Sequence, residues 1–152
     1  MYQTIMVPLD GSELAECVLP HVESLVRGGE VKKVILSQVI KPFFPHPGYS
    51  VISESLTKEI EGAHETAAND YLRKIADRLT LPAGVQLETR ALFGNVAETL
   101  VDFVQKSPVD LIVIATHGRS GVGRWVLGSV ADRLLHALTV PVLMVRAADH
   151  HT

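Results

Sequence analysis

Short apolar runs alternate along this chain with longer stretches in which apolar residues recur every three or four positions. The short runs predict strands at 4–9, 31–40, 84–92, 109–116 and 140–146. The longer stretches predict helices at 12–29, at 53–79, from 95 into the segment QKSP at 105–108, and at 129–138. Strands and helices therefore alternate strictly from one end of the chain to the other.

This alternation predicts an α/β fold with a parallel sheet, because parallel strands need crossover connections of helical length. Right-handed crossovers then favour a doubly wound, five-stranded parallel sheet in a three-layer α/β/α sandwich. No repeat or linker divides the chain, so we expect one domain over residues 1–147. The polar segment 148–152 predicts a frayed tail.

Several residues predict where the helices begin, bend and end. Ser12 is a candidate N-cap and Gly28-Gly29 a candidate stop for the first helix, while Pro20 inside it predicts a kink. Asn95 followed by Glu98 predicts a capping box. The helix at 53–79 is expected to bury one face, formed by Ile60, Ala63, Ala67, Tyr71, Leu72, Ile75 and Leu79.

Composition narrows the class of protein. The chain has 152 residues, of which 47% are hydrophobic and 20% charged, as in an ordinary globular domain. A formal net charge of −3 argues against nonspecific nucleic-acid binding. No apolar run is long enough to cross a membrane, and no basic segment followed by an apolar stretch opens the chain. With Cys17 as the single cysteine, we expect a cytoplasmic protein that is not held by a membrane.

Ligands of open parallel sheets bind beyond the carboxyl ends of the strands. The candidate segments are therefore PLDGS at 8–12 and ATHGRSGVGRWVLGS at 115–129. The second segment has four glycines, which allow a close approach of the backbone, and its Gly128-Ser129 lies at a predicted helix start that favours an anion. Arg119 and Arg124 can add contacts to phosphate, although the loop can also be a plain connection.

Familiar nucleotide-binding motifs are absent from these segments. The sequence has no GxxxxGK[ST] motif, and DGSELAE after the first strand contains no GxGxxG. The histidines do not fall at metal-ligand spacings with carboxylates or with Cys17, so no metal site is predicted.

Three segments resemble universal stress proteins of the A type. They are TIMVPLDGSELAECVLPHV at 4–22, DLIVIATHGRSGVGRWVLGSVADRLL at 110–135 and VPVLMVR at 140–146. The resemblance covers essentially the whole chain and implies a Rossmann-like fold related to the adenine nucleotide alpha hydrolases. ATP is the implied cofactor, with Mg²⁺ held through its phosphates.

The resemblance also implies which residues contact the nucleotide. Pro8, Leu9 and Asp10 match the segment that contacts the nucleoside, with Asp10 near the ribose or the adenine, and the Val39 backbone matches a contact to the adenine edge. ATP-binding members carry Gly, two residues, Gly, nine residues, then Gly followed by Ser or Thr. This chain keeps the spacing but begins it with Ala115 in place of glycine. The matching phosphate-side residues are Gly118, Arg119, Gly128, Ser129 and Val130.

Asp10 and His117, both candidate contacts to the nucleotide, each have an alternative role. Asp10 can cap the first turn in place of contacting a ligand. His117 can reach a phosphate, or its side chain can orient the loop by hydrogen bonding to backbone groups.

Three functions stay open from sequence. The first is an ATP-binding regulatory or sensing module in a stress response. The second is a homodimer of the same type that binds no nucleotide and works through protein contacts. The third is a slow ATPase, for which His117 and Asp10 are the only candidate residues. No catalytic residue is assigned, and the stress and the protein partner stay unidentified.

The last strand, 140–146, predicts a homodimer. A fifth and final strand lies at the sheet edge in either common doubly wound order, and VPVLMV carries no charge. An uncharged edge strand exposes unpaired backbone groups beside apolar side chains. Pairing with the same strand of a second copy satisfies those groups around a two-fold axis, and the resemblance implies the same interface.

Overall fold

The computed structural model describes residues 1–44, 53–117 and 128–147. Within these residues, five parallel strands form one sheet in the order β3-β2-β1-β4-β5. The strands are β1 (Thr4–Leu9), β2 (Lys33–Ile40), β3 (Gln86–Phe93), β4 (Leu111–His117) and β5 (Val142–Ala147). The direction of winding reverses between β1 and β4, so the predicted doubly wound sheet is confirmed.

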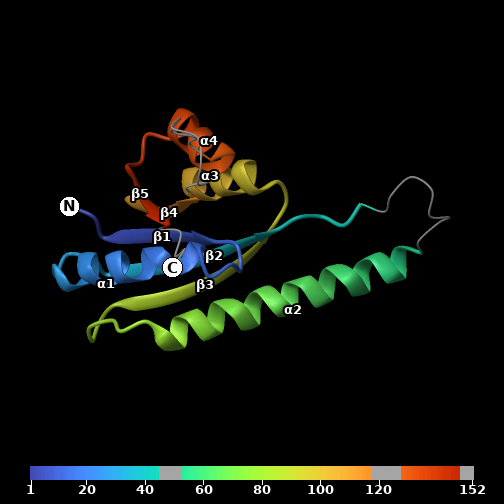
Figure 1. The fold of residues 1–152 in the computed structure, drawn as a ribbon, viewed down its shortest axis with the longest axis horizontal. Helices are drawn as coiled ribbons and strands as arrows, with labels where there is room; N and C mark the ends of the chain where they lie inside the picture. Colours follow the sequence, from blue (N-terminus) through green and yellow to red (C-terminus); the bar gives the residue numbers. More distant parts are fainter. Residues whose placement is uncertain (45–52, 118–127, 148–152) are drawn as a thin grey trace, which may run out of the picture.

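Helices cover both faces of the sheet (Figure 1). They are η1 (Ala15–Val18), α1 (Leu19–Arg27), α2 (Glu54–Arg78), α3 (Val96–Lys106) and α4 (Ser129–Ala137). The first three pack on one face, and α3 and α4 pack on the other. The predicted three-layer sandwich is therefore confirmed, and the predicted tail 148–152 lies outside the described residues.

The central strand β1 is buried on both faces. Ile5, Met6 and Val7 have no exposed surface. Because side chains alternate along a strand, Ile5 and Val7 pack against η1, α1 and α2, while Met6 packs against α3 and α4. This double burial explains why the strand is apolar without interruption up to Pro8.

The helix predicted for 12–29 is two pieces. Residues 15–18 form the 3₁₀ helix η1, and α1 begins at Leu19, so Pro20 lies in the first turn of α1. A proline removes no intrahelical hydrogen bond there, because the first N–H groups of a helix have no partner within the helix. The break therefore precedes Pro20, and the predicted kink at this residue is wrong. The predicted stop is confirmed: Gly28 is the C-cap and Gly29 has φ of +87°.

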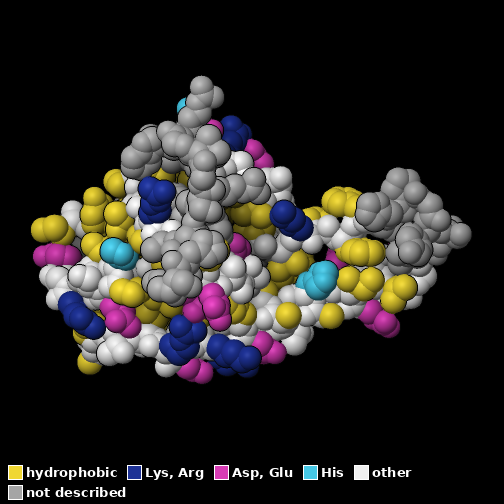
Figure 2. Space-filling view, in the orientation of Figure 1, with side chains coloured by type: hydrophobic (Ala, Val, Ile, Leu, Met, Phe, Trp, Pro, Cys, Tyr) yellow, Lys and Arg dark blue, Asp and Glu magenta, His cyan; other side chains and the backbone are white. Residues whose placement is uncertain are grey.

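Helix α2 is longer than the strands it covers. Its 25 residues span about 37 Å at 1.5 Å per residue, whereas an eight-residue strand spans about 26 Å. Its N-terminal part consequently extends past the carboxyl edge of the sheet (Figure 1). Hydrophobic side chains lie along this projecting end of α2, at the right of Figure 2.

This projection corrects the predicted buried face of α2. Ala63 and Ala67 are exposed and Ile60 is half-buried, because the sheet does not reach them. The residues that α2 buries are Ala68, Leu72 and Ile75.

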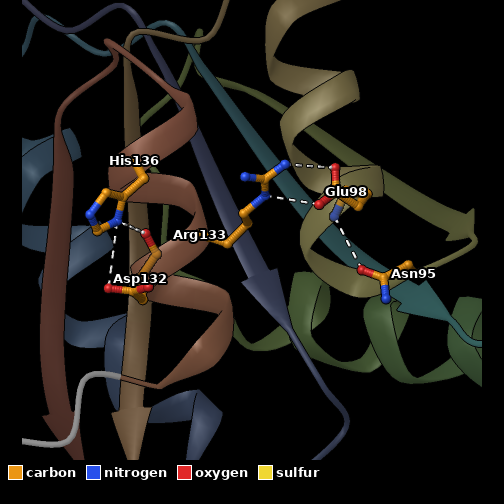
Figure 3. A network of polar contacts seen from close by, with 5 residues as sticks. All are labelled: Asn95, Glu98, Asp132, Arg133 and His136. Atoms are coloured by element: carbon orange, nitrogen blue, oxygen red, sulfur yellow. Dashed lines mark hydrogen bonds and ion pairs between the residues drawn. The ribbon is translucent and has the colours of Figure 1, made fainter.

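A surface network links α3 to α4 (Figure 3). The Asn95 side chain accepts a hydrogen bond from the Glu98 N–H at 3.3 Å, as predicted for an N-cap. The Glu98 carboxylate, however, accepts two hydrogen bonds from Arg133 on α4, at 2.8 and 3.3 Å. Only the Asn95 half of the predicted capping box therefore forms, because Glu98 bonds across the helix pair.

The two ends of α2 should differ in their effect on stability. Leu72→Ala removes a side chain with no exposed surface and should lower the free energy of unfolding by about 2–5 kcal/mol. Leu56→Ala, at a side chain 44% exposed on the projecting part, should change it by less than about 1 kcal/mol. Urea unfolding followed by circular dichroism measures both. Equal losses would show that the projecting part of α2 packs as tightly as the rest.

Candidate nucleotide-binding cleft

A cleft of about 750 Å³ opens at the carboxyl edge of the sheet, between α2 and the helices on the opposite face. Its floor is the end of β1 and the end of β2. Its lining residues are Pro8, Leu9, Asp10, Gly11, Gln38, Val39, Ile40, Lys41, His64, Ala67, Ala68, Tyr71, Val96, Leu100 and Val130. The cleft therefore lies where parallel sheets bind ligands.

The end of β1 is held by a tight turn. Oδ1 of Asp10 accepts hydrogen bonds from the Ser12 N–H at 2.9 Å and the Ser12 hydroxyl at 2.6 Å. The intervening Gly11 has φ of +85°, which a residue with a side chain adopts only under strain. Asp10 thus has the turn-capping role that the sequence left open. Among the described residues, its Oδ2 has no hydrogen-bond partner and is available to a ligand.

The end of β2 presents one polar and one apolar side chain to the cleft. Gln38 follows Leu36 on the α1–α2 face, and Val39 follows Ile35 on the α3–α4 face, since side chains alternate along a strand. Oε1 of Gln38 is buried without a hydrogen-bond partner among the described residues. An unpaired buried acceptor costs about 1–3 kcal/mol, so a donor supplied by a ligand would stabilise this amide.

One wall of the cleft is the inner face of α2. His64, Ala67, Ala68 and Tyr71 follow at steps of three and four residues, which puts them on the same side of the helix. Glu16 of η1 holds this wall in place. Its carboxylate accepts a hydrogen bond from the Tyr71 hydroxyl at 3.4 Å and pairs with Arg78 at 2.9 Å.

The opposite wall is apolar and comes from α3 and α4. Val96 and Leu100 belong to α3, and Val130 is the second residue of α4. Gly128, the N-cap of α4, has φ of −59° and ψ of 146°, and a Cβ added to it would meet no described atom within 4 Å. Neither the backbone conformation nor any described neighbour therefore requires glycine at this position.

The structure brings together part of the predicted site. Pro8, Leu9, Asp10, Val39 and Val130 all line the cleft. Gly128 and Ser129 are exposed at the start of α4, next to Val130.

Other predicted residues lie elsewhere. The Ala115 side chain packs against the core on the α1–α2 face, and His117 is the last residue of β4, paired in register with Ala147. Gly118 and Arg119 lie outside the described residues, as does Arg124.

The α2 wall is the part of the cleft that sequence reasoning missed. The spacing of Ala67 and Tyr71 is that of a core helix and predicts a buried face for both. The available signal was the length of the helix, about 37 Å, which exceeds the length of about 26 Å of an eight-residue strand. In the structure the excess length lies past the carboxyl edge of the sheet, on the side where ligands bind (Figure 1).

The described residues give little support for metal binding, for a reactive thiol or for a membrane span. No group of three or more metal-ligating side chains is found there. Burial raises the pKa of the Cys17 thiol, which disfavours the reactive thiolate. None of the described helices is long and apolar enough to span a membrane.

Comparisons with known proteins point to one family. Residues 1–146 match the model of the universal stress protein family. The chain is 31% identical over 150 residues to universal stress protein MJ0531 of Methanocaldococcus jannaschii, covering 96% of this chain and 83% of that protein. The solved structure of MJ0577, from the same organism, is 28% identical with a TM-score of 0.78 and covers 98% of this chain and 99% of that one.

A universal stress protein solved in complex with cAMP has the same fold. It is 24% identical, has a TM-score of 0.68 and covers 97% of this chain and 99% of that one.

The surroundings of the Tyr71 hydroxyl predict that the free energy of unfolding falls at alkaline pH. Burial, together with the charges of Glu16 and Asp10, raises the pKa of Tyr71 above the ordinary value of about 10. The folded protein therefore keeps a proton that the unfolded chain releases as the pH rises past about 10, so the free energy of unfolding falls.

Between pH 9 and pH 11, the urea midpoint of Tyr71→Phe should fall less than that of the wild type. Tyr2→Phe, in the exposed N-terminal segment, is the control. Identical declines in Tyr71→Phe and the wild type would contradict the assignment.

Proposed function

Since the chain belongs to the universal stress protein family, we propose that it binds ATP in the cleft and acts as a regulatory or sensing module in a stress response. The observation that carries the proposal is the convergence of Asp10, Val39 and Val130, from three separate elements, on one cleft. The cAMP bound by a relative of the same fold supports an adenine nucleotide as the ligand class. The single cysteine, Cys17, fits a reducing compartment such as the cytoplasm.

The cleft suits the nucleoside part of ATP. Its side walls are mainly apolar, and polar groups are few and lie mostly at the floor, as is typical of small-molecule sites. Asp10 can accept from ribose hydroxyls or from the adenine amino group through Oδ2. The unpartnered Gln38 amide can supply a further acceptor after rotation about its last side-chain bond.

The start of α4 suits the phosphate part. The first N–H groups of a helix have no intrahelical acceptor and favour an anion. Gly128 is exposed there with an ordinary backbone conformation, and without a side chain it leaves the backbone open to a ligand. In this proposal Ser129 adds a hydroxyl donor, and Mg²⁺ is held through the phosphates.

Hydrolysis receives less support. Asp10 already accepts two hydrogen bonds from Ser12 through Oδ1, and within the described residues no other carboxylate lines the cleft. We therefore propose binding and not turnover as the function.

The second candidate function is a homodimer that works through protein contacts, and the two sheet edges favour its interface at β5. The outer strand β3 carries Glu88, which pairs with Lys33 and Arg90. Such charges protect an edge from pairing. In β5, residues 142–145 are uncharged, and Leu143 and Met144 are 37% and 40% exposed. A second copy joined at β5 would bury them, with or without nucleotide.

Replacing Gly128 should separate binding from folding. Gly128→Val puts a branched side chain where the phosphates would approach, so ATP affinity should fall about tenfold or more. The melting temperature should fall by no more than about 4 °C, because the backbone conformation suits any residue and only the poorer N-cap is felt. Gly62→Val is the matched control, since a Cβ there also meets nothing within 4 Å. Unchanged affinity in calorimetry of Gly128→Val would remove the phosphate site from this position.

Charges on β5 should dissociate the dimer. The double variant Leu143→Lys and Met144→Lys should sediment as a monomer at concentrations where the wild type is a dimer, because lysines would face each other across the two-fold axis. Leu135→Lys, at a side chain 41% exposed on α4, should leave the dimer intact. A wild type that sediments as a monomer at micromolar concentration would contradict the interface.

A further inference from the structure

The inner face of α2 changes character along its length. Where the helix lies over the sheet, this face carries Leu72 and Ile75, which are almost completely buried. Where it passes the sheet edge, the same face carries Ala67 and Ala68, bracketed by His64 and Tyr71. Large side chains thus fill the helix–sheet contact, while small ones leave the cleft open.

Ala67 is the informative position on this wall. It is exposed although it lies on the inner face, whereas its neighbour Ala68 is 3% exposed. The opposite wall presents Val39, Val96 and Leu100. A flat ring between these two walls would exchange water for apolar contact on both of its faces.

The floor between the walls identifies the kind of ring. Asp10 and Gln38 offer hydrogen-bonding groups there, and Gln38 has the buried, unpartnered Oε1. Such groups pair with the edge of a heterocycle that carries an amino donor, as Gln pairs with adenine. A purely hydrocarbon ring would leave Oε1 of Gln38 and Oδ2 of Asp10 without partners.

We propose that α2 forms the second wall of the base-binding site and that Ala67 sets the width available to the purine ring. This inference rests on the proposed adenine-nucleotide function and adds to it residues from an element outside the two strand-end segments. Tyr71 is a positioning residue of this wall, because its hydroxyl and Arg78 both bond to Glu16.

The test compares two alanines one turn apart on α2. Ala67→Leu should lower the affinities for adenosine and for ATP by the same factor, about tenfold or more. The larger side chain narrows the space for the base but does not touch the site of the phosphates. Ala63→Leu adds the same atoms at an exposed position that does not line the cleft, and its affinities should stay within about twofold of the wild type. Isothermal titration calorimetry gives the affinities, and circular dichroism confirms that both variants fold.

The outcomes separate this inference from the proposed function. If Ala67→Leu binds adenosine and ATP as tightly as the wild type does, the inference that α2 is a wall of the base site is overturned. The proposal that the protein binds ATP is then unaffected. If Ala67→Leu lowers the affinity for ATP but not the affinity for adenosine, the base does not lie against α2, and the inference is again overturned.

A wild type that binds neither adenosine nor ATP would overturn the proposed function itself. The wall is then tested by ¹³C-methyl NMR of the alanines with adenine, guanine and indole as probes. A shift at Ala67 that is absent at Ala63 supports the wall for another flat ring. No shift at Ala67 with any of the three overturns it.

Discussion

Burial of the central strands on both faces is the constraint on which the rest of the structure depends. β1 and β4 lie at the middle of the sheet, and Ile5, Met6, Ile112 and Val113 are completely buried. A strand buried in this way has no room for polar side chains along its length. The functional groups are therefore displaced to the strand ends, where Asp10 follows β1 and Gln38 comes near the end of β2.

The length of α2 then turns this edge into a cleft. A helix as long as the strands would end at the edge of the sheet and leave Asp10 and Gln38 on an open surface. Because α2 continues past the edge, Ala67 stands opposite Val96 and Leu100 across a sheltered space. Glu16 holds the helix at this position through Tyr71 and Arg78, so the first helical segment of one layer helps to shape the wall of the site.

Two residues form a different local structure from the one that their sequence motifs predict. Glu98 has the spacing to complete a capping box with Asn95, yet its carboxylate bonds to Arg133 of the neighbouring helix. Pro20 has the position of a helix kink, yet the chain uses it in the first turn of α1. For Glu98, a preference within one element is weaker than a contact that joins two elements. For Pro20, the position in the first turn of α1 is itself the local preference of proline.

The sequence by itself determined the order of strands and helices, the doubly wound sheet and the strand ends that carry Asp10 and Val39, because these follow from periodicity and from the geometry of parallel crossovers. It did not determine which apolar residues of α2 are core. Ala67 and Leu72 both belong to the apolar positions that predict the buried side of α2, although they lie about 140° apart around the helix. The position of the assembled sheet and its edge decides that Leu72 is buried while Ala67 lines a cleft. That edge is a property of the assembled layers, since it depends on how far one element extends past another.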